Sequence, residues 1–321
     1  MSIRVAVLDD YQQVARTMAD WQGTLPDADV TFFDRHFADE GELTAALEPF
    51  EVVVAMRERT AFPRTVFERL PRLRLLVTTG MRNAAIDLAA AADAGVTVCG
   101  TRSHPSGTAE LTWAMIMNLV RGVAAEDARM HNSLVGDGRW QHTVDQDLDG
   151  EVLGVVGLGR LGGKVAAVGA AFGMDVVAWS PNLTAERAAE HGARLVEKAE
   201  LFATAKIATV HMVLSDRSRG LIGASELSAM RPDGYLVNTS RFGLIDADAL
   251  RTALRTGRPA GVALDVYDTE PLPGDHWLRM SPRALLSPHM GYVTAASYRV
   301  FYADIVEDIT AFQAGAPVRT L

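Results

Sequence analysis

The stretch that decides the fold runs Val152-Leu153-Gly154-Val155-Val156-Gly157-Leu158-Gly159-Arg160-Leu161-Gly162. Its first five residues are typical of a buried parallel strand, and a helical run over residues 164–172 follows the glycines. In such a strand-turn-helix unit the first glycine permits the tight turn, the second lets the backbone approach a pyrophosphate, and the third allows close helix-strand packing. The N–H groups of the loop and of the helix N-terminus then suit phosphates. We therefore predict a dinucleotide-binding loop that includes Arg160 and Leu161; the alternative is a glycine-rich packing turn.

The end of the next predicted strand, residues 175–179, bears on the choice between NAD and NADP. An NAD-binding unit usually carries a carboxylate there, which binds the ribose hydroxyls and repels a 2'-phosphate. Ser180 occupies this position, and both Ser180 and Asn182 can donate hydrogen bonds to a phosphate. We therefore expect an NAD(P) cofactor, with NADP favoured over NAD.

Short apolar runs alternate with amphipathic segments on both sides of the loop, which is the pattern of βαβ units around a parallel sheet. Before the loop, strands are predicted at 3–8, 30–33, 52–55, 73–78 and 96–99, with helices at 41–47, 63–70 and 84–94. From the loop onward, strands are predicted at 152–156, 175–179, 207–213, 234–238, 261–265 and 284–287, and a final helix at 294–314. The sequence thus predicts an α/β protein with two doubly wound parallel-sheet domains.

A long helical segment, TAELTWAMIMNLVRGVAAEDARM at residues 108–130, lies between the two sets of strands. Its first half is apolar on nearly all sides and must therefore be buried. We predict a single helix here, with Thr108 able to cap its N-terminus.

Three polar residues follow apolar runs in the last third of the chain: Arg241 in NTSRFGLID, Glu270 in LDVYDTEPLP and His289 in LLSPHMGYVT. Arginine clamps carboxylates and stays charged, histidine exchanges protons near neutrality, and a carboxylate bonded to an imidazole fixes its tautomer. The alternatives are a surface arginine, a structural histidine and a solvated loop acid. The position of Arg241 after a strand favours the functional interpretation, because ligands of open α/β sheets collect beyond the carboxyl ends of strands. Together with the glycine loop, these motifs resemble the D-isomer-specific 2-hydroxyacid dehydrogenase family over essentially the whole chain.

The resemblance implies a discontinuous, flavodoxin-like substrate domain (residues 1–102 and 293–321) and a Rossmann cofactor domain (residues 103–292). It implies hydride transfer between NAD(P)H and a small 2-oxo acid, with His289 as the acid/base, Glu270 as its partner and Arg241 as the carboxylate clamp. Family members that act on formate have glutamine at the position of Glu270, so glutamate supports the 2-hydroxyacid branch.

The same resemblance implies further cofactor contacts. Asp265, in the LDV motif, would accept a hydrogen bond from the nicotinamide carboxamide; a strand-end aspartate that caps a turn is the alternative. Thr108 and Thr239 are weaker candidates for cofactor contact.

Substrate contacts are expected from the N-terminal domain. The loop Gly80-Met81-Arg82 follows a predicted strand, and similar loops in the family offer backbone N–H groups to the substrate carboxylate. Met81 and Arg82 depart from the small or β-branched residue that is more usual after this glycine. Arg57 follows another strand and would add positive potential, or would instead pair with Glu58.

Composition narrows the classes of function. The 321 residues are 48% hydrophobic and 22% charged with a formal net charge of -9, and the acids and bases are interspersed, which argues against nucleic-acid or membrane partners. Cys99 is the only cysteine, so no internal disulfide forms. No uncharged apolar run approaches the ~20 residues of a membrane span, and the first apolar run meets Asp9 and Asp10 before it reaches signal-peptide length. We expect a cytoplasmic protein without a metal site, since HExxH, paired CxxC and P-loop motifs are absent from the sequence.

Two other functions stay open. One is a dehydrogenase of the same fold that oxidises another small anion, such as phosphite; the other is a non-catalytic protein that senses NAD(H). The family is usually dimeric through its cofactor domains, so we expect a homodimer. The apolar helix from residue 108 to residue 120 fits either such an interface or a core.

Overall fold

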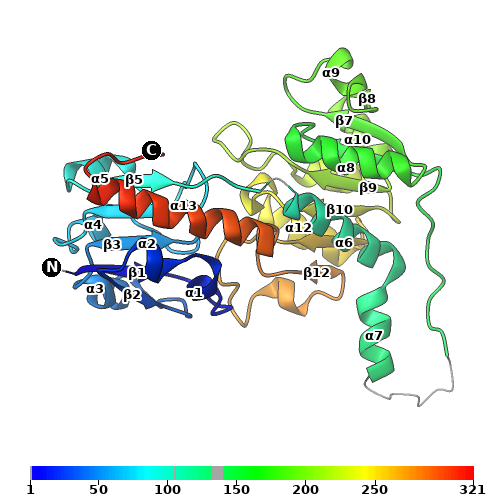
Figure 1. Cartoon of the computed structure of the whole chain (residues 1–321). Helices are drawn as coiled ribbons and strands as arrows, with labels where there is room; N and C mark the ends of the chain where they lie inside the picture. Colours follow the sequence, from blue (N-terminus) through cyan, green and yellow to red (C-terminus); the bar gives the residue numbers. More distant parts are fainter. Residues whose placement is uncertain (1, 105, 132–139) are drawn as a thin grey trace. The chain divides into compact units, whose positions relative to one another are not determined.

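The structure is a computed structural model that describes residues 2–104, 106–131 and 140–321. The chain divides into two compact units, unit 1 (Met1–His104 and Val293–Leu321) and unit 2 (Pro105–Tyr292). Unit 1 is built from both ends of the chain, because the C-terminal helix α13 (Ala295–Gln313, red) packs with the strands and helices of the first hundred residues (blue to cyan in Figure 1).

Unit 1 contains a five-stranded, wholly parallel sheet. Its strands are β1 (Ile3–Val7), β2 (Ala28–Phe32), β3 (Val52–Ala55), β4 (Leu75–Thr78) and β5 (Thr97–Gly100), in the spatial order β2-β1-β3-β4-β5. This is the flavodoxin-like order. One face is covered by α3 (Glu40–Leu47), α4 (Arg64–Phe67) and α5 (Leu88–Asp93), whose apolar side chains share a core with the strands. The helix α13 packs on β4 and on α1 (Ala15–Met18) and α2 (Trp21–Thr24).

Unit 2 contains a seven-stranded parallel sheet. Its strands are β6 (Val152–Val156), β7 (Asp175–Trp179), β8 (Arg194–Leu195), β9 (Ile207–Val210), β10 (Tyr235–Asn238), β11 (Gly261–Leu264) and β12 (Ala284–Leu286), in the order β12-β11-β10-β9-β6-β7-β8. Counted from β6, this is the Rossmann order 3-2-1-4-5-6 with one added strand. The predicted class of two doubly wound parallel sheets is confirmed.

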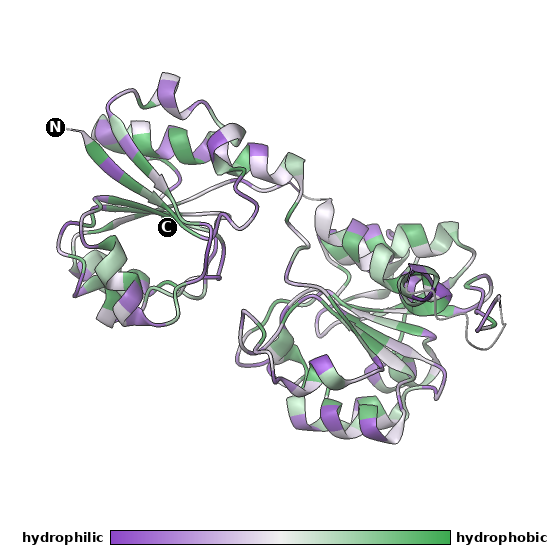
Figure 2. Cartoon of the chain, turned by 90° about the horizontal axis from the view of Figure 1, so that it is seen from below, coloured by the Kyte–Doolittle hydropathy of each residue, from purple (hydrophilic) through white to green (hydrophobic). Residues whose placement is uncertain are grey.

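Helices cover both faces of the sheet in unit 2. On one face lie α6 (Gly107–Arg121), α8 (Arg160–Ala171) and α9 (Ala185–Ala189), and on the other lie α10 (Lys198–Thr204), α11 (Ala224–Ala229) and α12 (Ala247–Thr256). The remaining elements are α7 (Val123–His131) and the 3-10 helices η1 (Phe242–Leu244) and η2 (Trp277–Met280). Figure 2 shows the apolar strands of each unit between helices that carry polar residues on their outer sides.

The prediction of one helix over residues 108–130 is wrong. Gly122 adopts a left-handed conformation (φ 58°) and donates its N–H to the Asn118 carbonyl at 2.8 Å, which ends α6 and separates it from α7. This is the usual way in which glycine terminates a helix. Thr108 does not cap α6: it lies in the first turn after Ser106, and its hydroxyl donates to the Gly291 carbonyl at 3.2 Å.

The apolar side of α6 is part of the core of unit 2. Trp113, Met115 and Ile116 are at most 8% exposed and pack with side chains of β6, β10 and β11. This face is therefore core, as the second alternative proposed, and it is not available to a second chain.

Smaller errors concern the ends of strands. The strand predicted to reach Val213 ends at Val210, and Val213 itself is 73% exposed. The two-residue strand β8 was not predicted, because a pair of residues carries no periodicity.

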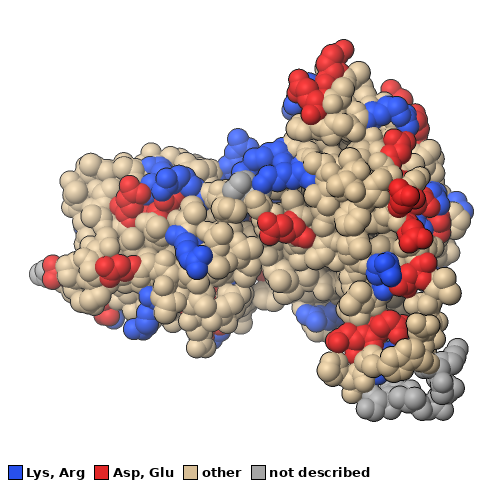
Figure 3. Space-filling view, turned by 45° about the vertical axis from the view of Figure 1, so that its right-hand side comes forward, with Lys and Arg blue, Asp and Glu red and all other residues tan. Residues whose placement is uncertain are grey.

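No helix among the described residues has the length and apolarity needed to cross a membrane. Acidic and basic side chains are interspersed over most of the surface visible in Figure 3. One compact group there contains basic side chains alone. Within the ranges that the structure describes, no group of three or more histidine, cysteine or acidic side chains is arranged to hold a metal ion.

The last residues of the chain are tied to unit 1 by buried acids of α13. Arg319 donates to the Asp308 carboxylate (Nη2–Oδ1 3.0 Å), and Arg102 donates to the Asp304 carboxylate through both its backbone and its side chain. Burial raises the pKa of Asp308 to about 7. Burial also acts on Asp304, but hydrogen bonds from Arg102 outweigh it and lower the pKa of that carboxyl.

These opposite shifts predict opposite pH dependences of stability. A carboxyl with a raised pKa in the folded state stabilises the fold below its unfolded value and loses that contribution as the pH rises, here between 3.8 and about 7. Asp308→Asn should therefore gain melting temperature relative to wild type as the pH increases through this window. Asp304→Asn, the matched control, should lose melting temperature at neutral pH and approach wild type as the pH falls toward the acid range. A difference in melting temperature between Asp308→Asn and wild type that stays the same at all pH values would contradict the raised pKa of Asp308.

Candidate active site

The predicted dinucleotide loop joins β6 to α8 in unit 2. Gly157 has φ +95°, and a Cβ there would lie 2.8 Å from the His211 carbonyl oxygen. A Cβ on Gly162 would lie 2.1 Å from the Gly157 carbonyl oxygen, so this glycine allows the helix to pack on the turn. A Cβ on Gly159 would meet nothing within 4 Å.

The three positions thus match the tight turn, the open approach and the close packing that a pyrophosphate loop requires. The first N–H groups of α8, at Arg160, Leu161 and Gly162, have no helical partner by position, and Gly159 supplies no side-chain cap. This unit therefore fits a dinucleotide, whose phosphates these N–H groups would bind.

The end of β7 carries no carboxylate. Ser180 is half-buried directly after Trp179, and Asn182 is exposed. Thr184 accepts a hydrogen bond from the Arg187 N–H at 3.3 Å and caps α9. The described strand end therefore lacks the acid that would repel a 2'-phosphate.

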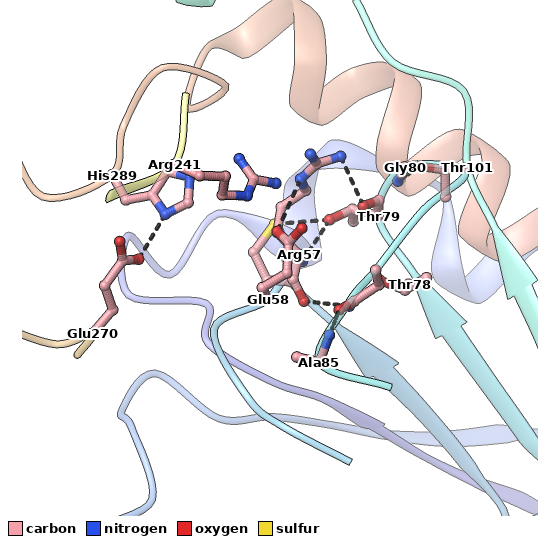
Figure 4. Close-up of polar contacts among 12 residues, drawn as sticks. Arg57, Glu58, Thr78, Thr79, Gly80, Ala85, Thr101, Arg241, Glu270 and His289 are labelled. Carbon is pink, nitrogen blue, oxygen red and sulfur yellow. Dashed lines mark hydrogen bonds and ion pairs between the residues drawn. The ribbon is translucent and has the colours of Figure 1, made fainter. Parts of the chain in front are cut away.

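The loops after β10, β11 and β12 bring Arg241, Asp265 and His289 to one edge of the sheet. These strands are parallel neighbours, and Arg241 and His289 each follow a strand by three residues. Carboxyl ends of neighbouring parallel strands meet at the same edge, where ligands of open α/β sheets bind. Figure 4 shows the side chains of Arg241 and His289 in this region.

His289 and Glu270 form a close pair. The imidazole Nδ1 lies 2.6 Å from Glu270 Oε2 (Figure 4), and the second carboxylate oxygen of Glu270 accepts from the Tyr267 N–H at 2.9 Å. The two side chains are 15% and 25% exposed. Since an ionised Glu270 places a proton on Nδ1, Nε2 is left to exchange a proton with a substrate.

Asp265 holds the turn that carries His289. Its side chain is 1% exposed, and it accepts from the Ser287 hydroxyl (2.6 Å), the Met290 N–H (2.8 Å) and the Gly291 N–H (2.9 Å). Burial raises the pKa of Asp265, and these donors oppose the rise. The geometry favours the alternative in which this strand-end aspartate caps a turn.

Arg241 is placed by the turn after β10. Asn238, fully buried, donates its amide to the Arg241 carbonyl (2.9 Å) and accepts from the Ser240 N–H (2.9 Å), while Arg241 Nη1 donates to the Ser240 carbonyl (2.7 Å). The hydroxyl of Thr239, 7% exposed, lies 2.9 Å from that of Thr112. That hydroxyl is therefore already engaged within unit 2.

Two positioning residues were missed by the sequence reasoning. Tyr267 orients Glu270 through its N–H and donates its hydroxyl to the Ser287 carbonyl at 2.8 Å. Ser287 also binds Asp265. A tyrosine between the aspartate and glutamate of LDVYDTEP, and a serine two residues before the histidine, were the available signals.

The substrate candidates in unit 1 lie on the loops after β3 and β4. Arg57 has φ +53° and donates its N–H to Thr79 Oγ1 (2.9 Å) and its Nη1 to the Thr79 carbonyl (3.3 Å, Figure 4). Met81 and Arg82 are exposed. The expectation of available N–H groups is wrong for Gly80, whose N–H donates to Thr101 Oγ1 at 2.8 Å.

Substitutions at two glycines separate folding from cofactor binding. Gly162→Ala should lower the melting temperature, because its methyl group would collide with the Gly157 backbone, at a cost of roughly 1–3 kcal/mol. Gly159→Ala should keep the wild-type melting temperature but weaken NADH and NADPH binding, measured by fluorescence titration, by about tenfold or more, because the methyl group fills the approach to the pyrophosphate. If the folded Gly159→Ala variant bound both cofactors with wild-type affinity, the prediction that this loop binds the cofactor phosphates would be wrong.

Comparison with known proteins supports the same interpretation of unit 2. Residues 113–291 match the family model for "D-isomer specific 2-hydroxyacid dehydrogenase, NAD binding domain". A D-3-phosphoglycerate dehydrogenase of Synechocystis is 32% identical over 284 residues, which cover 88% of this chain and 50% of that protein. The chain therefore spans about half the length of that relative. A glyoxylate reductase of Aeropyrum pernix is 32% identical over 286 residues, covering 83% of this chain and 84% of that protein.

Solved structures agree in fold. The crystal structure of a phosphoglycerate oxidoreductase from Vibrio cholerae superposes with a TM-score of 0.91 at 34% identity, covering 98% of this chain and all of that one. The match extends over both units of the chain.

Proposed function

The chain belongs to the D-isomer specific 2-hydroxyacid dehydrogenase family, and on this premise we propose that it reduces a small 2-oxo acid with NAD(P)H. The observation that carries the proposal is the His289–Glu270 pair, at 2.6 Å, on the carboxyl edge of a Rossmann sheet with a glycine loop that fits a dinucleotide. Reduction of a 2-oxo acid needs a hydride at C2, a proton for the carbonyl oxygen and a counter-charge for the carboxylate.

Each requirement has a candidate group. A bound reduced nicotinamide supplies the hydride. His289 gives a proton from Nε2 to the carbonyl oxygen, and Glu270 holds the imidazole through Nδ1 and stabilises its charged form. Arg241 binds the substrate carboxylate through its guanidinium. Arg57, Met81 and Arg82 complete the proposed substrate contacts, and unit 1 and unit 2 take the substrate and cofactor roles.

The cofactor contacts proposed are the loop from Gly157 to Gly162, with Ser180 and Asn182 near the ribose. The family resemblance adds Thr108, Thr239 and Asp265 toward the nicotinamide; besides capping the turn, Asp265 would accept through Oδ2, which takes the Gly291 N–H, whereas Oδ1 takes two donors. The missing carboxylate after β7 supports NADP over NAD. We also propose a homodimer formed through unit 2, because Val123, Met130, Trp140 and Val144 are 58–99% exposed there. Light scattering should then give twice the chain mass of 34.6 kDa.

The test of the reaction class is the loss of NADH or NADPH absorbance with glyoxylate, hydroxypyruvate, pyruvate and phenylpyruvate in turn. We expect turnover with at least one acid and a lower KM for NADPH than for NADH. Cofactor binding without turnover of any acid would favour the two alternatives, oxidation of another anion such as phosphite or NAD(H) sensing.

Variants of the pair test the roles of its members. His289→Ala should lower kcat by about a hundredfold or more with a smaller change in KM, because the proton donor is lost. Glu270→Gln keeps the shape but removes the carboxylate that orients the imidazole through Nδ1, so it should lower kcat with little change in KM. Arg241→Ala should chiefly raise KM. Near-normal turnover by His289→Ala would contradict the assignment of His289 as the proton donor.

A further inference from the structure

We propose, resting on the function proposed above, that Glu58 makes the chain select a singly charged, unphosphorylated 2-oxo acid against its phosphorylated counterpart. Arg57 and Glu58 directly follow Met56 at the carboxyl end of β3. The strand order of unit 1 reverses between β1 and β3, and ligands of open α/β sheets bind in the crevice at such a switch point. Glu58 therefore lies where unit 1 is expected to meet a ligand.

Backbone strain marks the same place. Asp9, after β1, has φ +57°, and Arg57, after β3, has φ +53°. Residues other than glycine rarely adopt this left-handed conformation, and strain of this kind concentrates at functional sites. Each of the two strands that flank the switch point is thus followed, two residues later, by a charged residue at positive φ.

Arg57 lies over the loop assigned to the substrate. A Cβ on Gly80 would be 2.1 Å from Arg57 Nη1, so the guanidinium rests directly on this glycine. The contacts of Arg57 with Thr79 hold it there, as Figure 4 shows. It is a cation that an anionic substrate group would meet at this loop, beside the exposed Arg82.

Glu58 offsets that cation. Its Oε2 lies 3.8 Å from Arg57 Nε, and the two side chains are 19% and 23% exposed, so solvent screens the pair only in part. The neighbouring Arg59 is turned to the end of β1, where it donates to the Asp9 carbonyl at 3.0 Å and lies 4.7 Å from the ring of Tyr11.

The formal charges of these loops cancel. The loops that directly follow β1, β3 and β4 carry three acids and three bases. The acids are Asp9, Asp10 and Glu58, and the bases are Arg57, Arg59 and Arg82. A phosphate monoester adds about -1.5 to -2 charges at pH 7 to the carboxylate of a 2-oxo acid. Phosphate sites usually present uncompensated arginine or lysine, and a carboxylate beside the phosphate weakens binding by like-charge repulsion. Relatives named D-3-phosphoglycerate dehydrogenase are named for a phosphorylated compound; the charge balance here fits the compound without the phosphate.

The experiment compares hydroxypyruvate with 3-phosphohydroxypyruvate, which differ only by the phosphoryl group. kcat/KM is measured for both with wild type, Glu58→Gln and the control Glu68→Gln, which removes the same charge from an exposed position of unit 1. Wild type should prefer hydroxypyruvate by about tenfold or more, and Glu58→Gln should shrink that preference by about tenfold, since it exposes the Arg57 charge. Glu68→Gln should keep the wild-type preference. Glu58→Ser repeats the test if the glutamine variant melts at a lower temperature.

Equal or better turnover of the phosphorylated acid by wild type would overturn the proposal, and so would an unchanged preference in folded Glu58→Gln. If neither acid is turned over, glyoxylate, pyruvate and phenylpyruvate test the proposed function separately, and calorimetric binding of D-glycerate and D-3-phosphoglycerate decides the selection by itself. Tighter wild-type binding of D-glycerate, reduced in Glu58→Gln, would sustain the role of Glu58. Tighter wild-type binding of D-3-phosphoglycerate than of D-glycerate would contradict the proposed role of Glu58.

Discussion

The carboxylate of Asp265 is the constraint on which the candidate active site depends. It lies at the end of β11 and binds three donors from the turn that follows the neighbouring strand β12. Those three hydrogen bonds flank His289, whose backbone has the left-handed conformation, φ +49°, that residues other than glycine adopt uncommonly. In this conformation the imidazole meets Glu270, which the Tyr267 N–H fixes in turn. A buried acid with satisfied oxygens thus holds the strained turn that aims the proposed proton donor.

The two units share one structural principle. In each, a doubly wound parallel sheet delivers polar residues to the carboxyl edge of neighbouring strands. Three of the five residues other than glycine that the structure places at positive φ, Asp9, Arg57 and His289, lie on these edges. Backbone strain of this kind concentrates at functional sites.

The sequence allowed the architecture and the glycine loop to be predicted, because both depend on local periodicity and on fixed spacing. Gly157 and Gly162 have the close contacts that their places in the motif require. The break of the long helix at Gly122 was missed, because the apolar pattern continues past a glycine that only the structure shows to be left-handed. The engaged N–H of Gly80 and the donors around Asp265 were equally hidden, since hydrogen bonds between distant segments follow from coordinates and not from spacing. The functional roles of the site residues remain proposals.

The most direct test of the central claim, that the strained His289 and its partners serve hydride transfer to a 2-oxo acid, is an isotope experiment. Hydroxypyruvate is incubated in unlabelled water with the chain and with reduced nicotinamide cofactor that carries deuterium at both C4 positions, and the product is analysed for configuration and label. The account predicts D-glycerate with deuterium at C2, because the hydride comes from the cofactor and only the hydroxyl proton from the protein and water. L-glycerate, or D-glycerate without deuterium at C2, would contradict it.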